Sequence, residues 1–165
     1  MSNKKIRVSL LQIEGRETPI LNASLIKKAL IKAYKFNPDI ICLPECANIM
    51  TANKSHLVKH ATLQKDCPVL EECIQFAKKY NKFVSVGSLL LKKNNSSKLL
   101  NRSFFINHSG KIMAYYDKIH LFDVNINRKE VHRESKSFHK GNKVAIVTSP
   151  WGKIGLTICY DIRFP

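Results

Sequence analysis

The feature that most constrains the fold lies at the beginning of the chain, where two apolar runs flank one amphipathic helix. Ile6–Ile13 and Asp39–Leu43 are rich in Val, Ile and Leu, which predicts buried strands. Pro19–Phe36 repeats apolar residues at helical spacing, and Asn37-Pro38 ends that helix. A strand, a helix and a second strand make a βαβ unit with parallel strands. The chain is therefore predicted to have an α/β fold.

The middle of the chain predicts antiparallel pairing instead. A second amphipathic helix is expected from Pro68 to Tyr80, because proline suits the first helical position. Three strands should follow with hairpin-like connections: Phe83–Leu91, Leu99–Asn107 and Lys111–Tyr116. A mixed sheet with helices on one face fits both halves of this pattern.

The last third combines a long loop with a further strand pair. The loop is expected from Asp117 to about Gly141, and loops longer than about 12–15 residues in compact domains tend to be functional. Asn142–Ser149 should then pair, through the turn at Pro150–Gly152, with the strand that ends at Cys159.

Composition bounds the class of protein. The 165 residues are 44% hydrophobic and 24% charged, which suits one globular domain or part of one. The formal charge of +16 is consistent with an anionic partner, but its lysines occur in ones and twos and no arginine-rich block appears. A specific nucleic-acid site is therefore not predicted.

The cysteines and the N-terminus bear on compartment. Five cysteines are an odd number and none forms a CxxC pair with nearby histidines, which argues against a disulfide framework and a zinc site. The start of the chain lacks a signal-peptide pattern, and no apolar run approaches the length of a membrane span. We expect a reduced, cytoplasmic protein without a membrane partner.

Four residues at strand ends or in adjoining loops carry candidate chemistry: Glu45, Lys118, Glu134 and Cys159. Each has a plainer interpretation, because cysteines are often buried and inert, and glutamates and lysines after strands are usually solvated. A thiol with a pKa of about 8.5 needs a base or a positive environment to act as a nucleophile. A glutamate can be that base, and a lysine can stabilise an oxyanion. Together they can perform acyl transfer without a metal or cofactor.

Three segments carry a family resemblance: Ile41–Glu45, Tyr116–Phe122 and Gly155–Pro165. In this order they resemble the signature segments of the nitrilase superfamily of carbon–nitrogen hydrolases. Within it the chain is most similar to the Nit-type amidases, the omega-amidase and deaminated glutathione amidase group. The resemblance implies an α-β-β-α sandwich and an amidase acting on a small linear amide.

The resemblance also implies roles for individual residues. Glu45 would be the general base, and Cys159 would attack the amide carbonyl, expel ammonia and leave a thioester. Lys118 and the backbone N–H of Tyr160 would hold the oxyanion. Glu134 would orient the lysine or the substrate.

Members of this family continue beyond the segment that ends at Pro165. Residues 1–165 are therefore expected to form a carbon–nitrogen hydrolase domain truncated at its C-terminus. This incomplete sandwich is expected to have impaired amidase activity and to be a homo-oligomer if completed. The alternative is a non-catalytic remnant, or one half of a split enzyme, that only binds partner chains.

Overall fold

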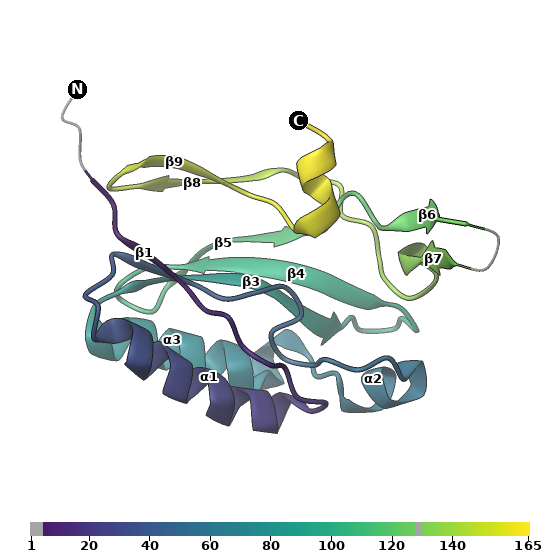
Figure 1. Ribbon diagram of the computed structural model, residues 1–165, viewed down its shortest axis with the longest axis horizontal. Coiled ribbons are helices and arrows are strands. Elements are labelled where there is room, and N and C mark those ends of the chain that lie inside the picture. The colour runs from purple at the N-terminus through teal and green to yellow at the C-terminus, as the bar shows by residue number, and fades with distance from the viewer. Residues whose placement is uncertain (1–4, 128–129) are drawn as a thin grey trace.

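The computed structural model describes residues 5–127 and 130–165, and its main sheet has five strands (Figure 1). They lie in the order β1-β2-β3-β4-β5, with β1, β2 and β3 parallel and β3, β4 and β5 antiparallel. The predicted mixed sheet is confirmed. The strands are β1 (Val8–Leu10), β2 (Ile40–Cys42), β3 (Phe83–Lys92), β4 (Leu99–Ile106) and β5 (Ile112–Asp117).

Two long helices, α1 (Pro19–Tyr34) and α3 (Pro68–Tyr80), cover one face of this sheet (Figure 1). Each begins with proline, as predicted, and α3 ends at Asn81 in the left-handed conformation that often terminates helices. The shorter α2 (Lys54–His60) and η1 (Gln64–Asp66) lie between them in the chain. In the described ranges, no helix is both long enough and apolar enough to cross a membrane.

The main core lies between the helices and the sheet. Ile26 and Leu30 of α1 and Phe104 of β4 have no exposed surface. Burying an aliphatic or aromatic side chain of this size stabilises a fold by about 1.5–3 kcal/mol. This core fixes the βαβ unit and therefore the strand ends at which the candidate residues lie.

A two-stranded sheet covers the opposite face (Figure 1). It consists of β8 (Ala145–Ser149) and β9 (Gly152–Leu156), which pair through the predicted turn. Val147 and Leu156 pack with Phe105 of β4 in a second core. Successive residues of a strand point to opposite faces, so Phe104 faces the helices while Phe105 faces this hairpin.

The prediction of a buried first strand over Ile6–Ile13 was wrong. Only Val8–Leu10 forms a strand, and the Leu10 side chain is 79% exposed. β1 is the edge of the sheet, where a strand has only one neighbour to cover it. The apolar residues that do pack against the main core, Leu11 and Ile13, follow the strand.

The predicted long loop over residues 117–141 also contains regular structure. Apart from residues 128–129, which lie outside the described ranges, it holds a small antiparallel pair and a short helix. These elements are β6 (Asp123–Asn125), β7 (Val131–Arg133) and η2 (Glu134–Lys136). Their strands are three residues long and mostly exposed, so they carry too little apolar alternation to be recognised in the sequence.

A bulge in β3 brings this strand unusually close to the end of β2. The register of β3 against β4 shifts between Val86 and Leu89. A Cβ atom on Gly87 would lie 2.3 Å from the carbonyl oxygen of Leu43. Only glycine permits this approach of two backbones. The bulge therefore fixes the point at which the chain leaves β2 toward Glu45.

We predict that Gly87→Ala is strongly destabilising, because its methyl group would collide with backbone that cannot move aside. The expected loss in the free energy of unfolding is at least about 1–3 kcal/mol. Gly155→Ala is the matched control, since a Cβ there meets no atom within 4 Å. Urea unfolding of both variants measures the difference. Equal stability of the two variants would contradict the close approach.

Candidate active site

The structure brings the four candidate side chains together from four segments. Glu45 follows β2, Lys118 follows β5, Glu134 opens η2, and Cys159 opens η3 (Cys159–Arg163). The Lys118 Nζ lies 3.1 Å from Oε1 of Glu45 and 3.0 Å from Oε2 of Glu134. The Cys159 thiol lies near enough to the Glu45 carboxylate for that group to raise the pKa of the thiol. A nucleophile, two carboxylates and an ammonium group therefore share one site.

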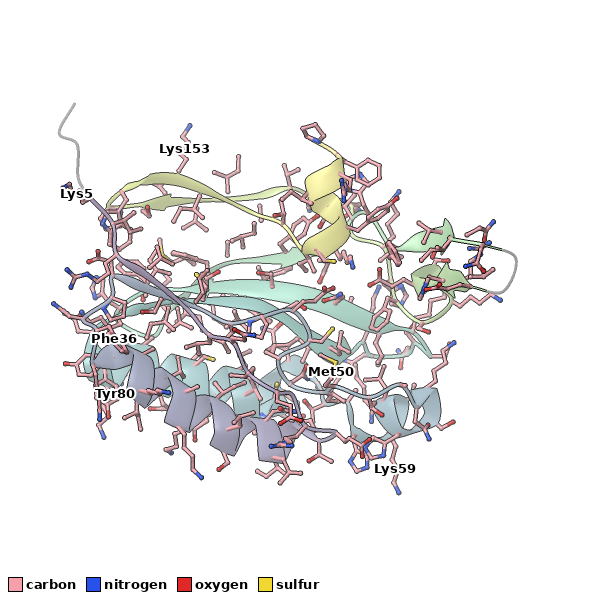
Figure 2. All side chains as sticks on the ribbon, viewed as in Figure 1. Lys5, Phe36, Met50, Lys59, Tyr80 and Lys153 are labelled. Carbon is pink, nitrogen blue, oxygen red and sulfur yellow. The ribbon has the colours of Figure 1, made fainter. Side chains whose placement is uncertain are left out.

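Lys118 differs from the lysines that dominate the surface. Lys5, Lys59 and Lys153 project from separate regions of the periphery (Figure 2), whereas Lys118 is only 2% exposed. Burial alone would lower the pKa of Lys118, but hydrogen bonds and charge from Glu134 and Glu45 outweigh it and raise that pKa. Lys118 is therefore protonated at neutral pH, although it is buried.

The loop that carries Glu45 is fastened to the bulge of β3. The N–H of Ser88 donates to the carbonyl of Pro44 at 3.2 Å, and the Ser88 hydroxyl accepts from the N–H of Cys46 at 3.0 Å. Two residues further along, the buried Asn48 side chain exchanges two 2.8 Å hydrogen bonds with the backbone of Leu90. These bonds hold the Glu45 backbone on both sides, and its carboxylate is consequently positioned by rigid strands.

Glu134 is held by the segment that precedes it in the long loop. Its Oε2 accepts the N–H of Phe122 at 2.6 Å and also contacts Lys118. The side chain is 14% exposed, compared with 31% for Glu45. Glu134 is therefore the more enclosed partner of the lysine, and Glu45 is the carboxylate with access to an incoming ligand.

Cys159 presents its thiol at a strained backbone position. It begins η3, and its φ of 48° lies in the left-handed region that is unusual for a side chain with a Cβ. It is also the only exposed cysteine in the described part of the chain. The strand predicted to end at Cys159 ends earlier, at Leu156, and Cys159 instead opens the short helix that follows.

The Cys159 thiol is kept in its protonated form. Burial is the largest cause of its raised pKa, the charge and hydrogen bond of Glu45 act in the same direction, and Lys118 opposes them. At neutral pH the thiolate fraction is consequently below that of a free cysteine. A nucleophilic role for this thiol would therefore require a base that takes its proton, because little preformed thiolate is present.

A second thiol, Cys46, lies near the same charges. Burial, and then the charge of Glu45, raise the pKa of Cys46 to about 12. Sequence reasoning did not single out Cys46, although it directly follows Glu45 in the chain. Because Cys46 is largely enclosed and more strongly held protonated, it is a poor nucleophile despite its position.

Asp161 joins the segment bearing Lys118 to the turn bearing Cys159. Its carboxylate accepts hydrogen bonds from the Tyr116 hydroxyl and the His120 N–H, both at 2.8 Å, and from the Ile158 N–H at 2.9 Å. Burial would raise the pKa of Asp161, but these hydrogen bonds together lower it. Asp161 is therefore a buried, ionised carboxylate whose hydrogen bonds hold the segment around Lys118 at a fixed distance from the turn that carries Cys159.

The side chain of Tyr160 lies away from the charged groups. Its ring packs edge-on against Phe122, with centroids 5.0 Å apart. Any contribution of Tyr160 to the chemistry would therefore come from its backbone N–H, as the resemblance implies. Its aromatic ring instead joins η3 to the long loop.

Sequence reasoning did not single out Asn101, Tyr116 or Asp161, which contact the candidate residues or connect them. Asn101 lies inside an apolar strand, and its Nδ2 donates to Oε1 of Glu45 at 2.9 Å. A polar residue at an inward position of a strand was the available signal. Among the described residues, no group of three or more His, Cys, Asp or Glu side chains is arranged to hold a metal ion.

Comparison with known proteins identifies the class to which this fold and site belong. The sequence model of the family described as Carbon-nitrogen hydrolase matches residues 7–165. The chain belongs to this family. Among the relatives of known activity, the similar proteins include Nit-type omega-amidases and deaminated glutathione amidases.

Two sequence relatives and one solved structure show the extent of the similarity. The deaminated glutathione amidase of Yersinia enterocolitica is 32% identical over 98% of this chain and 57% of its own length. The omega-amidase of Saccharomyces cerevisiae is 30% identical over 99% of this chain and 58% of its own length. The crystal structure of the Caenorhabditis elegans NitFhit protein matches with a TM-score of 0.85 and 30% identity, covering 97% of this chain and 39% of that one. The chain spans little more than half the length of the two sequence relatives.

We predict that Cys159 is alkylated before Cys42 and Cys67, and that its rate follows a pH profile set by Glu45. The wild-type midpoint should lie above that of an unperturbed cysteine, because burial and Glu45 raise the pKa of this thiol. Glu45→Gln should move it to lower pH, because the variant removes a negative charge that favours the protonated thiol while Lys118 remains. Pulsed iodoacetamide labelling with mass spectrometry measures both effects.

The control for this experiment is Glu72→Gln, which alters a carboxylate paired with Lys27 on the surface. This variant should keep the wild-type midpoint for Cys159. A midpoint that stays unchanged in Glu45→Gln would show that the carboxylate does not act on the thiol, and a midpoint that rises would show that it favours the thiolate instead.

Proposed function

We propose that this chain is a cysteine-dependent amidase that hydrolyses a small linear amide and releases ammonia. The observation that supports it most is the contact of Lys118 with Glu45 and Glu134 beside the exposed thiol of Cys159. Family membership supplies the reaction class, because the family is that of carbon–nitrogen hydrolases. The names of the relatives favour an ω-amide of a small carboxylic acid as the substrate class.

The first half of the reaction forms a thioester. Glu45 takes the proton from the Cys159 sulfur as that sulfur attacks the amide carbonyl carbon, and the carbonyl oxygen becomes an oxyanion. An ammonium group has three N–H donors, and with two directed to carboxylates the Lys118 Nζ keeps one for this oxyanion. The backbone N–H of Tyr160 is the second donor. Glu45 then gives its proton to the departing nitrogen, the C–N bond breaks, and ammonia leaves.

The second half returns the enzyme to its starting state. Glu45 removes a proton from water, whose oxygen attacks the thioester carbonyl, and the same two donors stabilise the second oxyanion. The C–S bond breaks, the sulfur recovers its proton from Glu45, and the carboxylic acid leaves. An amide and water thus become an acid and ammonia, and the proposal requires no cofactor.

Glu134 contributes to these reaction steps through its contact with Lys118. Its carboxylate lies 3.0 Å from the Nζ and keeps the lysine protonated and fixed while Glu45 gains and loses a proton. Without it, protonation of Glu45 would leave the buried ammonium group without a counter-ion. A reducing, cytoplasmic setting is part of the proposal, supported by the five unpaired cysteines.

We expect the chain to release ammonia from small ω-amides, and Cys159→Ala to abolish this release. Lys118→Met should reduce kcat by about 10²–10³, as removal of an oxyanion donor does. Coupled ammonia detection measures both variants. Glu72→Gln is the control with a surface carboxylate, and it should retain wild-type activity. Turnover that persists in Cys159→Ala would overturn the proposed mechanism.

The alternative function, a chain that acts only by binding partner chains, is favoured by the exposed face of the β8–β9 hairpin. Val144, just before β8, and Ile146, two positions further along, are 81% and 63% exposed. Exposed apolar side chains on a strand invite association. On this alternative, sedimentation would show self-association or association with another chain, Val144→Lys with Ile146→Lys would weaken it, and ammonia release would be absent. A monodisperse active monomer would exclude it.

A further inference from the structure

Asn101 occupies a place in β4 from which it reaches two of the candidate residues. It is 1% exposed, and its backbone carbonyl accepts the N–H of Lys118 at 3.0 Å. Its side-chain Nδ2 lies 2.9 Å from Oε1 of Glu45 and 3.4 Å from Oε1 of Glu134. One residue thus contacts the backbone of the lysine and both carboxylates that flank it.

The contact with Asn101 gives the two carboxylate oxygens of Glu45 different partners. The hydrogen bonds from Asn101 Nδ2 and Lys118 Nζ both end on Oε1, at 2.9 Å and 3.1 Å. A carboxylate oxygen has two lone pairs, so these donors occupy Oε1 fully. Oε2 is left as the oxygen that can receive the proton of the Cys159 thiol.

The orientation of the amide follows from its neighbours. If the group were turned over, its Oδ1 would face carboxylate oxygens of Glu45 and Glu134, and acceptors would meet acceptors. In the observed orientation Oδ1 is buried and has no hydrogen-bond partner among the described residues. A buried oxygen without a partner destabilises a fold. Asn101 is therefore better explained by what its NH₂ group does than by a contribution to stability.

The neutral charge of an asparagine also matters at this position. The site already holds two carboxylates and one ammonium group. A further carboxylate would add negative charge beside the thiol, and a further cation would compete for Glu45. A neutral donor can hold Glu45 in place without either effect.

We infer that Asn101 is a positioning residue for the general base: it holds Oε1 of Glu45 beside Lys118, so that Oε2 is left to face Cys159. The catalytic meaning of this role rests on the proposed amidase function. The geometric part of the inference is independent of that function. It states that the amide of Asn101 controls the charge environment of the Cys159 thiol through Glu45.

The test uses Asn101→Asp, which has nearly the same shape but replaces the NH₂ donor with a third carboxylate. Iodoacetamide labelling of Cys159 across pH should show a midpoint shifted upward by about half a pH unit or more, since added negative charge disfavours the thiolate. The control is Asn22→Asp, another buried asparagine, whose Nδ2 donates to the backbone of Arg16 and Asn48. Its midpoint should match the wild type even if its stability falls.

Asn101→Ser removes the reach of the amide without adding charge, and it keeps the test informative if the aspartate variant folds poorly. With an ω-amide substrate, kcat should fall by at least about tenfold with KM nearly unchanged, because the base is misplaced while the binding groups remain. The labelling midpoint of Cys159 in folded Asn101→Ser should also move, because Glu45 is no longer held where Asn101 places it. Loss of stability alone would not move that midpoint.

The outcomes separate this inference from the proposed function. If the wild-type chain releases no ammonia but Asn101→Asp shifts the labelling midpoint and Asn22→Asp does not, the amidase proposal fails and the role of Asn101 stands. An unchanged midpoint in a folded Asn101→Asp, or an equal shift in Asn22→Asp, would overturn the role of Asn101. Wild-type kcat and an unmoved Cys159 labelling midpoint in Asn101→Ser would overturn it as well.

Discussion

The contact on which the site depends is the buried ammonium group of Lys118 between Glu45 and Glu134. Neither carboxylate alone would suffice, because an ammonium group that is 2% exposed needs its charge and its hydrogen bonds satisfied at once. Removing one partner from a buried pair of this kind typically destabilises a protein by about 3–5 kcal/mol. The end of β2, the end of β5 and the start of η2 are therefore held at fixed distances by the same three groups.

This contact requires the sheet to be built first. Glu45 and Lys118 lie 73 positions apart in the chain, and they meet because β2 and β5 belong to one sheet whose order is set by the βαβ unit and the following hairpins. The bulge at Gly87 then brings the loop after β2 against β3, and Asp161 connects η3 to the segment after β5. Packing places the charged groups, and the charged groups in turn fix the loops.

Much of this architecture could be predicted from the sequence, and the reasons differ between elements. The strands Ile40–Cys42 and Phe83–Lys92 are buried and apolar, and the helices begin at prolines, so local patterns identified them. β1 was misjudged because an apolar run does not reveal whether a strand lies at an edge. The β6–β7 pair was not predicted, because exposed three-residue strands are too short to show an alternation of apolar and polar residues.

The site was predicted from residue types at strand ends and from three motifs of one family, and the family is confirmed by the match over residues 7–165. The roles of Glu45, Lys118, Glu134, Cys159 and the N–H of Tyr160 remain predictions. Asn101 and Asp161 could not be identified in this way, because their importance arises from strand register and from contacts over 41 to 56 positions. Such contacts depend on which way a strand faces and where it bulges, and a single sequence does not specify either.

The raised pKa of Cys159 has a consequence for the chemical durability of the chain. Oxidation by peroxide and exchange with disulfides both begin from a thiolate. Partial burial of the sulfur and the charge of Glu45 keep the thiol protonated. Adventitious oxidants therefore encounter a slow-reacting thiol, although Cys159 as a residue is exposed. The same carboxylate that would activate the sulfur toward a bound amide thus shields it from damage while the site is idle.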